Sequence, residues 1–216
     1  MSELILLRHG QAAFGNEHYD QLSTLGEAQA RATGDFLQAR KWQFDRVITG
    51  PRQRQRLTAT LAARVTDSEL HEDLRLDEFA EGSQILAAAE QRAGGPLENK
   101  KARLRAYMQE IRLWCNGDIT IDGTASASDF CRTVDDWLES VTADPAPGQQ
   151  LLAVTSAGVI AAVLCRVLNQ PREAIADWMA VLGNASLTTL MFSRGRLSVR
   201  EINSNGHLPV ELLSGI

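Results

Sequence analysis

Residues 3–11 read Glu3-Leu4-Ile5-Leu6-Leu7-Arg8-His9-Gly10-Gln11, an apolar run that ends in an arginine, a histidine and a glycine. Such a run is typical of a strand buried on both faces, as in a parallel sheet. Open α/β sheets bind ligands beyond the carboxyl ends of such strands. Arg8 and His9 would lie there, and Gly10 would let the backbone approach a ligand closely. An ordinary surface Arg-His pair at a strand end explains the same letters, so function must be judged on the rest of the chain.

The composition is that of an ordinary globular protein. The 216 residues carry a formal net charge of −5 and are 44% hydrophobic and 23% charged. This length suits one sizeable core, and we expect a single domain over residues 1–216. The acidic balance offers no basic surface for nucleic acid, and no apolar run reaches the roughly 20 residues that cross a bilayer. We therefore expect neither a nucleic-acid partner nor a membrane partner.

The cysteines and histidines show no paired spacing. Cys115, Cys131 and Cys165 are odd in number, far apart and without a CxxC pair. This favours reduced, mostly buried thiols in a cytoplasmic protein. The N-terminus lacks the basic segment and the cleavage site of a signal peptide, which also predicts a cytoplasmic location. The four histidines have no metal-ligand spacing. We expect no metal and no other cofactor.

Strand and helix patterns alternate in the first part of the chain. The segment Thr24-Leu25-Gly26-Glu27 fits a capping box and predicts a helix after the polar loop 11–23. Residues 45–49 predict a second strand. Gly50-Pro51 then opens a second helix, with Arg54 in its first turn. A third strand is expected at about residues 69–74.

Residues 80 to 147 show helical patterns only, and we interpret them as a helical insertion that covers one edge of an α/β core. Its helices are expected at 84–92, 98–115 and 127–142. The alternation then resumes. A strand is expected at 151–155, a helix at 158–168, and a terminal hairpin at 187–192 and 197–202. The expected fold is a three-layer α/β/α structure with a mostly parallel sheet and an antiparallel edge hairpin.

Several ordered blocks carry a resemblance to a known family. Arg8-His9-Gly10 is followed by the block Asp20-Gln21-Leu22-Ser23-Thr24-Leu25-Gly26. Gly50-Pro51, Arg54 and Thr58-Ala59 resemble a block that usually reads Ser-Pro-Leu-x-Arg-Ala-x-Gln-Thr-Ala. Leu76-Asp77-Glu78 resembles a segment that carries an acid, and residues 154–160 occupy a slot that usually reads Val-Ser-His-Gly-Gly-Val-Ile. Asn203 and His207-Leu208 resemble the usual ending. Together these blocks resemble the histidine phosphatase (phosphoglycerate mutase-like) superfamily.

The resemblance implies a phosphoglycerate mutase-like fold and a phosphatase that needs no metal. His9 would attack phosphorus and form a phosphohistidine, because an imidazole with a pKa of about 6.5 is largely neutral at pH 7. Arg8 and Arg54 would bind phosphate oxygens through their planar guanidinium groups, and Gln11 would join the phosphate site. Glu78 would protonate the leaving oxygen and then activate water.

Ser156 stands where the family usually has a second histidine. That histidine donates a hydrogen bond, often with a positive charge, to the phosphoryl group. A charge-assisted hydrogen bond is worth about 1.5–3 kcal/mol, against about 0.5–1.5 kcal/mol for a neutral one. The replacement would slow the reaction on the order of tenfold to a hundredfold. Ser156 is expected to contact phosphate, to cap the following helix, or to do both.

Other positions leave alternatives open. The acid could also be one of three neighbours of Glu78, namely Asp73, Asp77 and Glu81. Further departures from the family pattern occur at Ala12, at Phe14-Gly15-Asn16, at Gly50 and at Leu57. The basic cluster Lys100, Lys101, Arg103 and Arg105 favours a solvated helix face over substrate steering. His207 favours packing over chemistry.

These features predict a phosphoric monoester hydrolase that acts on a small phosphomonoester or a phosphorylated protein. The alternative is a regulatory protein that binds phosphate esters with weak turnover or none. A mutase is disfavoured, because the segment after Glu78 lacks the tyrosine-rich pattern of true phosphoglycerate mutases. The sequence leaves a homodimer open.

Overall fold

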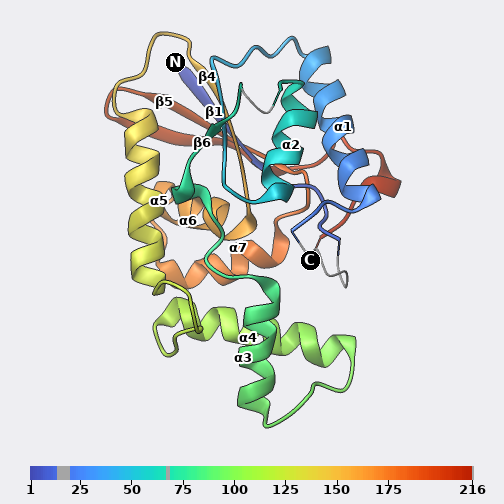
Figure 1. The fold of residues 1–216 in the computed structure, drawn as a ribbon. Helices are drawn as coiled ribbons and strands as arrows, with labels where there is room; N and C mark the ends of the chain where they lie inside the picture. Colours follow the sequence, from blue (N-terminus) through green and yellow to red (C-terminus); the bar gives the residue numbers. More distant parts are fainter. Residues whose placement is uncertain (14–19, 67–68, 216) are drawn as a thin grey trace.

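The computed structural model describes residues 1–13, 20–66 and 69–215, and its centre is one twisted sheet (Figure 1). The strands are β1 (Ser2–Arg8), β2 (Arg46–Thr49), β3 (His71–Glu72), β4 (Gln150–Thr155), β5 (Leu187–Ser193) and β6 (Arg196–Ser204). Their order across the six-stranded sheet is β3-β2-β4-β1-β5-β6. The apolar run of the N-terminus is therefore an inner strand, as its uninterrupted hydrophobicity predicts.

The sheet is mostly parallel, with an antiparallel hairpin at one edge. Strands β1 and β4 pair in parallel, as do β2 and β4 and the short pair β2 and β3. Strand β5 runs antiparallel to β1, and β6 runs antiparallel to β5. Because β1, β2 and β4 point the same way, the loops after all three meet at one edge. This confirms the predicted α/β fold class.

The described part of the chain contains seven helices. They are α1 (Thr24–Ala39), α2 (Gln53–Ala63), α3 (Gly82–Ala93), α4 (Lys100–Asn116), α5 (Ala127–Thr142), α6 (Ala157–Val167) and α7 (Ile175–Val181). Ile5 and Leu7 of β1 belong to the same buried cluster as residues of α1 and α2. Leu4 and Leu6 belong to the cluster that includes α5, α6 and α7. Alternate residues of one buried strand thus pack on two helical layers.

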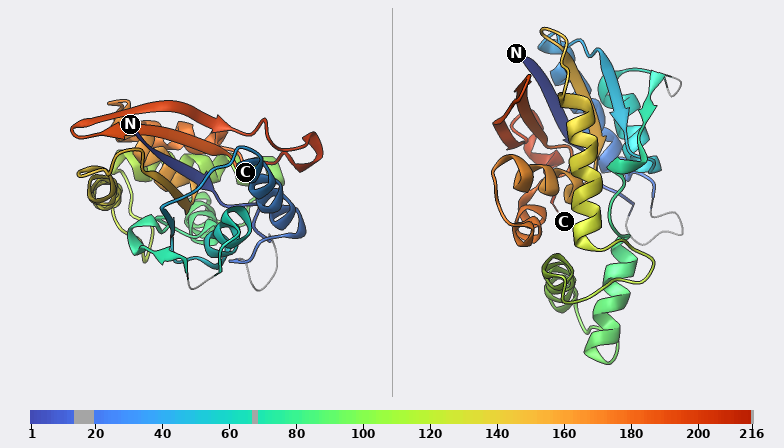
Figure 2. Two further views of the ribbon diagram at one scale, coloured as in Figure 1. Left: turned by 90° about the horizontal axis from the view of Figure 1, so that it is seen from above. Right: turned by 90° about the vertical axis from the view of Figure 1, so that its left-hand side faces the viewer.

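Residues 80–147, all of which the structure describes, contain helices and no strand. Helices α3 and α4 project beyond the carboxyl edge of the sheet, while α5 lies along one face beside α6 (Figure 2). The Phe79 ring stacks on Trp114 of α4 at a centroid distance of 4.0 Å and meets Phe130 of α5 at 5.7 Å. These aromatic contacts join the projecting helices to the core. Besides extending past the sheet, residues 80–147 therefore also form part of the hydrophobic core.

Three local expectations need correction. Helix α1 is capped by Ser23 rather than by Thr24, because the Ser23 Oγ accepts a hydrogen bond from the Gly26 N–H at 3.1 Å. The third strand is only His71–Glu72. It ends early because the Asp73 carboxylate accepts from the Arg75 N–H and so caps a 3-10 turn at Leu74–Leu76. Helix α7 lies in a segment for which we expected no element.

The three cysteines are free thiols. Burial raises the pKa of Cys115 to about 12, and it raises the pKa of both Cys131 and Cys165 to about 11. At neutral pH these groups stay protonated and unreactive. Within residues 1–13, 20–66 and 69–215, no helix is both long and apolar enough to cross a lipid bilayer.

Candidate active site

The candidate residues come together at the carboxyl edge of β1 and β4. Arg8, the last residue of β1, is the register partner of Thr155, the last residue of β4. One residue further, the His9 N–H donates to the Thr155 carbonyl at 2.9 Å. His9 and Ser156 therefore follow the paired ends of two neighbouring parallel strands. The segment that carries Glu78 reaches the same place through contacts with α2 and α6.

Gly10 is required by the packing of α1. A Cβ atom at Gly10 would lie 2.3 Å from the Gly26 carbonyl oxygen, and one at Gly26 would lie 2.1 Å from the Gln11 carbonyl oxygen. The Gly10 N–H also donates to the Thr58 Oγ1 at 3.1 Å. We expected Gly10 to admit a ligand. The structure instead brings the first turn of α1 against it, and this packing fixes the backbone that carries His9.

The His9 imidazole is only 7% exposed, and both ring nitrogens have partners. Its Nδ1 lies 2.7 Å from the Gly10 carbonyl oxygen, which can only accept, so Nδ1 carries the hydrogen. Its Nε2 accepts from the Arg54 Nε–H at 3.3 Å. The lone pair is therefore on Nε2. Burial, followed by the charges of Arg54 and Arg8, holds the pKa of His9 well below its usual 6.5, so the ring is neutral at pH 7.

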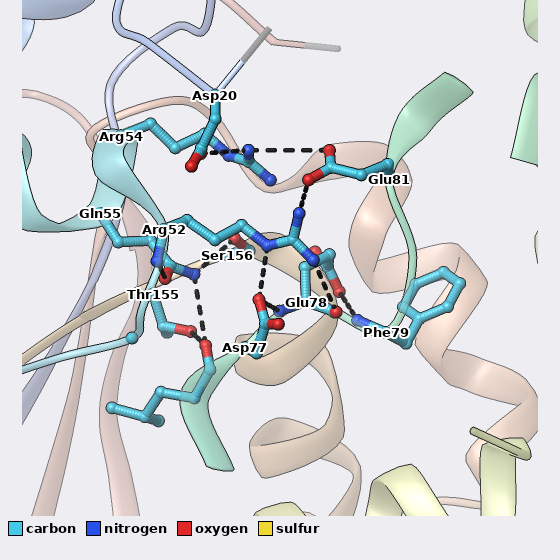
Figure 3. A network of polar contacts seen from close by, with 12 residues as sticks. Asp20, Arg52, Arg54, Gln55, Asp77, Glu78, Phe79, Glu81, Thr155 and Ser156 are labelled. Atoms are coloured by element: carbon cyan, nitrogen blue, oxygen red, sulfur yellow. Dashed lines mark hydrogen bonds and ion pairs between the residues drawn. The ribbon is translucent and has the colours of Figure 1, made fainter. Parts of the chain in front are cut away.

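Arg54, which bonds His9, also contacts two carboxylates, those of Asp20 and Glu81 (Figure 3). It lies in the first turn of α2, as the sequence predicts, and is 4% exposed. Its Nη1 contacts the Asp20 Oδ1 at 2.8 Å and the Glu81 Oε2 at 3.7 Å. A buried guanidinium is a strong donor to an anionic ligand, and such a ligand would compete with the two carboxylates for Arg54.

Arg8 and Gln11 lie near His9 with partners of their own. The Arg8 Nη1 donates to the Leu182 carbonyl oxygen, in the loop before β5. The Gln11 Oε1 accepts from the Ser23 Oγ at 3.0 Å, which ties this side chain to the start of α1. Arg8 is close enough for its charge to lower the pKa of His9. These contacts tie Arg8 to the segment before β5 and Gln11 to the start of α1.

Glu78 lies against the first turn of α6. Its Oε2 accepts from the Gly158 N–H at 3.0 Å, and its Oε1 accepts from the Phe79 N–H at 3.1 Å. Burial raises the pKa of Glu78 above its usual 4.5, although both hydrogen bonds and the nearby Arg54 act in the opposite direction. A Cβ atom at Gly158 would lie 2.1 Å from the Glu78 Oε1. The carboxyl group can therefore bind there only because residue 158 is glycine.

The alternative acids are held by arginines. The Asp73 Oδ2 pairs with the Arg75 Nη2 at 2.7 Å. Asp77 accepts from the Arg52 Nε–H at 2.5 Å, and Glu81 pairs with the Arg52 Nη1. Of the four candidate acids, Glu78 is the one that accepts a hydrogen bond from α6 beside Ser156.

Ser156 precedes α6 at the N-cap position, but its side chain makes no capping hydrogen bond. The expected capping role is therefore wrong. Glu78 takes that role, because it accepts from the Gly158 N–H. The Ser156 Oγ instead accepts from the Gln55 Nε2 at 2.9 Å, and the residue is 1% exposed. The hydroxyl therefore belongs to a buried polar network with α2 (Figure 3).

Sequence reasoning missed three residues that shape the site. Arg52 ties the segment around Glu78 to α2, because its Nη2 donates to the Glu78 carbonyl oxygen at 3.1 Å. Gln55 holds Ser156, and the Asn184 Nδ2 donates to the His9 carbonyl oxygen at 3.4 Å. Arg52 and Gln55 stand where the family block usually reads leucine and alanine, and this difference could have marked them. No motif pointed to Asn184.

The remaining predictions have simple outcomes. The His207 Nε2 lies 3.0 Å from the Thr33 Oγ1, and its ring stacks on Phe36 at 4.9 Å, so the predicted packing role is confirmed. The basic cluster at residues 100–105 lies on the exposed side of α4. Ala12 forms a short bridge with Leu22. The Phe14-Gly15-Asn16 segment lies outside the described residues.

Solved structures share this fold at low sequence identity. A phosphoserine phosphatase from Entamoeba histolytica, in complex with 3-phosphoglyceric acid, is 19% identical, with 97% of this chain and 100% of that chain covered and a TM-score of 0.70. The Bacillus stearothermophilus protein YhfR is 18% identical, with coverages of 96% and 99% and a TM-score of 0.72. A mycobacterial glucosyl-3-phosphoglycerate phosphatase is 24% identical, with coverages of 95% and 100% and a TM-score of 0.66.

Comparison with protein families gives a match over almost the whole chain. Residues 4–205 match the histidine phosphatase superfamily (branch 1). A search of curated proteins found no matching sequence. The family match spans β1, α2, the Glu78 segment and β4, which are the elements that meet at His9. The chain therefore belongs to the histidine phosphatase superfamily, branch 1.

Proposed function

We propose that the protein is a metal-independent phosphatase that forms a phosphohistidine at His9. One observation carries the proposal: the lone pair of the buried, neutral His9 ring is on Nε2 and faces the Arg54 guanidinium. A phosphoryl group whose oxygens bind Arg54 would have its phosphorus beside this nitrogen. Phosphoryl transfer depends mainly on such positioning and on charge stabilisation.

In the first step, the Arg54 Nε–H turns from the His9 Nε2 to a phosphoryl oxygen. The freed Nε2 lone pair then forms a bond to phosphorus as the bond to the leaving oxygen breaks. Arg54 and Arg8 would stabilise the charge on the phosphoryl oxygens. Glu78 would give its proton to the leaving oxygen, and its raised pKa favours the protonated form that this step needs. The product alcohol leaves, and the phosphoryl group stays on the imidazole.

In the second step, water attacks the phosphorus and the bond to Nε2 breaks. The electron pair returns to the imidazole, and the Glu78 carboxylate accepts a proton from the water. Inorganic phosphate is released, and His9 and Glu78 return to their starting protonation states. Because Glu78 acts first as an acid and then as a base, its pKa must allow both forms near the working pH.

The proposed substrate is a small phosphomonoester or a phosphorylated protein. Two solved structures of the same fold are of phosphatases for phosphoserine and for glucosyl-3-phosphoglycerate, which supports a phosphomonoester. The chain's own family membership supports the same reaction class.

The test is direct detection of the intermediate. Wild-type protein mixed with a ³²P-labelled aryl phosphate and quenched in alkali should retain label, because phosphohistidine is stable in alkali and labile in acid. His9→Ala should retain none and should hydrolyse the ester at least about a thousandfold more slowly. His207→Ala is the matched control, since the His207 ring stacks on Phe36 and bonds Thr33 rather than a proposed catalytic side chain. Equal hydrolysis by wild type and His9→Ala would rule the proposal out.

A second function has an observation in its favour. The Arg54 guanidinium already contacts Asp20 and Glu81, whose carboxylates compete with a phosphate, and Ser156 supplies no charge. A protein built this way could bind phosphate esters as a regulatory signal with weak turnover or none. It would bind phosphate through Arg8 and Arg54 yet give no labelled enzyme at any pH. Label trapped on His9 would exclude it.

A further inference from the structure

Gln55 is a fully buried amide of α2 that has no part in the proposed reaction. Its Nε2 donates to the Ser156 Oγ at 2.9 Å and to the Leu76 carbonyl oxygen at 3.2 Å. Its Oε1 accepts from the Arg52 N–H at 3.1 Å. The amide therefore joins α2, the turn before Glu78 and the loop after β4.

The partners of Gln55 decide which way the amide points. A backbone N–H can only donate and a backbone carbonyl can only accept, so Oε1 must face Arg52 and the NH₂ group must face Leu76. Both amide hydrogens are then used, one for Leu76 and one for Ser156. The Ser156 oxygen accepts one of them, which turns the serine's own hydrogen away from Gln55.

The chain on either side of Ser156 contacts both proposed catalytic residues. On one side, the His9 N–H donates to the carbonyl oxygen of Thr155, the residue before Ser156. On the other side, the Glu78 carboxyl accepts from the N–H of Gly158, two residues after it. In the proposed reaction, the phosphoryl group passes from the leaving oxygen beside Glu78 to His9, and Ser156 lies between these two residues' backbone contacts.

The place of the amide depends on Gly50. A Cβ atom at Gly50 would lie 2.2 Å from the Gln55 Oε1 and 2.6 Å from the Leu76 carbonyl oxygen. Any larger residue at this position would push the amide out of its plane of hydrogen bonds. Gly50, Gln55 and Ser156 therefore form one packed unit, in which the size of the first permits the contact between the other two.

We propose that Gln55 is a positioning residue that fixes the Ser156 hydroxyl as a hydrogen-bond donor to the phosphoryl group held at His9. The inference builds on the proposed phosphate site, but it concerns binding and can be tested without turnover. In this proposal, Gln55 affects phosphate binding through Ser156, while its bonds to Leu76 and Arg52 hold the fold. Its removal should therefore cost nothing once the serine hydroxyl is gone.

The experiment is a double-mutant cycle on the binding of inorganic phosphate, measured by calorimetry. Ser156→Ala should weaken binding about twofold to tenfold, the range for one neutral hydrogen bond. Gln55→Met should weaken it by the same factor or less, and the double variant should match Ser156→Ala alone. Ser156→Thr, which keeps the hydroxyl, should restore most of the affinity. Gln53→Met is the matched control, because Gln53 is exposed on the same helix and should leave affinity unchanged.

Thermal unfolding of each variant shows whether it folds. If Gln55→Met does not fold, Gln55→Glu completes the cycle: its carboxylate would draw the Ser156 hydrogen toward itself. Binding should then fall further in the wild-type background than in the Ser156→Ala background. Losses that simply add, an unchanged affinity for Ser156→Ala, or no phosphate binding by wild type would each overturn the inference. If the losses of phosphate affinity are non-additive but the protein shows no turnover, the role of Gln55 is supported and the proposed phosphatase activity is excluded.

Discussion

The loops that follow β1 and β4 lie side by side at one edge of the sheet, yet their key side chains are held differently. After β1, His9 is held by Gly10 of its own loop and by Arg54, a residue of the family pattern. After β4, Ser156 is held by Gln55, a residue outside that pattern. The role of His9 in the first loop can be predicted from short sequence motifs. The second makes sense only with a partner 101 positions away in the sequence.

The largest expected effect concerns Glu78, whose carboxyl group contacts the helix that follows the β4 loop. Glu78→Gln keeps the shape but removes the proton, so phosphoenzyme formation should fall about 10²- to 10⁴-fold with an alkyl phosphate. The loss should be smaller with 4-nitrophenyl phosphate, whose leaving oxygen needs less protonation. Stopped-flow single-turnover rates measure both. An equal loss for both esters would show that Glu78 does not act as an acid.

The pH dependence follows from the same pair of groups. His9 attacks only when unprotonated, so the rate rises with pH through its pKa, which lies well below 6.5. Glu78 donates only when protonated, so the rate falls as the pH rises through its pKa, which lies above 4.5. Single-turnover rates should therefore fall on the alkaline side in wild type and stay level in Glu78→Gln. A parallel fall in both proteins would assign that limb to another group.

A smaller effect is expected at the glycine that admits the carboxyl group. Gly158→Ala would place a Cβ atom 2.1 Å from the Glu78 Oε1, so the carboxyl must leave the α6 amide. We expect the rate to fall about tenfold to a hundredfold and the free energy of unfolding to drop by about 1–3 kcal/mol. Ala161→Gly in the same helix is a control that also changes stability. A rate that tracks stability alone in both variants would contradict the proposed contact.

The smallest expected effect tests whether Gln55 occupies the space beside residue 156 in the β4 loop. Ser156→His alone should not raise the rate, because Gln55 fills the space beside residue 156 and both positions are buried. Ser156→His combined with Gln55→Ala removes that obstacle, and we expect up to about a tenfold gain over the Ser156→His variant. The hydrolysis rate of one aryl phosphate at saturating concentration is the measurement. A full gain from Ser156→His alone would mean that Gln55 does not occupy this space.

Much of this arrangement could be predicted from local pattern. Apolar runs predicted β1 and β4, helical spacing predicted α3 to α5, and the family blocks brought His9, Arg54 and Glu78 to one edge. These features depend on periodicity or on short motifs, which are visible in a single sequence. Strand β3 was expected to be longer, because the Asp73 cap that ends it is a contact of side chain and backbone.

The parts that could not be predicted depend on contacts between distant segments. The Gln55 amide meets Ser156 and Leu76 only after the sheet has formed, and no spacing rule links these residues. Glu78, rather than the expected Ser156, caps α6. This contact could not be predicted either, because Glu78 comes from a different loop. Tertiary hydrogen bonds of this kind override local preferences for caps.

The ion pairs of Arg54 make phosphate binding an exchange of anions. In our proposal, an incoming phosphate takes over a guanidinium that Asp20 and Glu81 already contact, so its net affinity is the difference between two sets of ionic contacts. Both carboxylates are partly exposed and can turn toward water. When inorganic phosphate leaves, they return to Arg54 and stabilise the vacated charge. The same ion pairs that weaken the capture of phosphate therefore also speed its release.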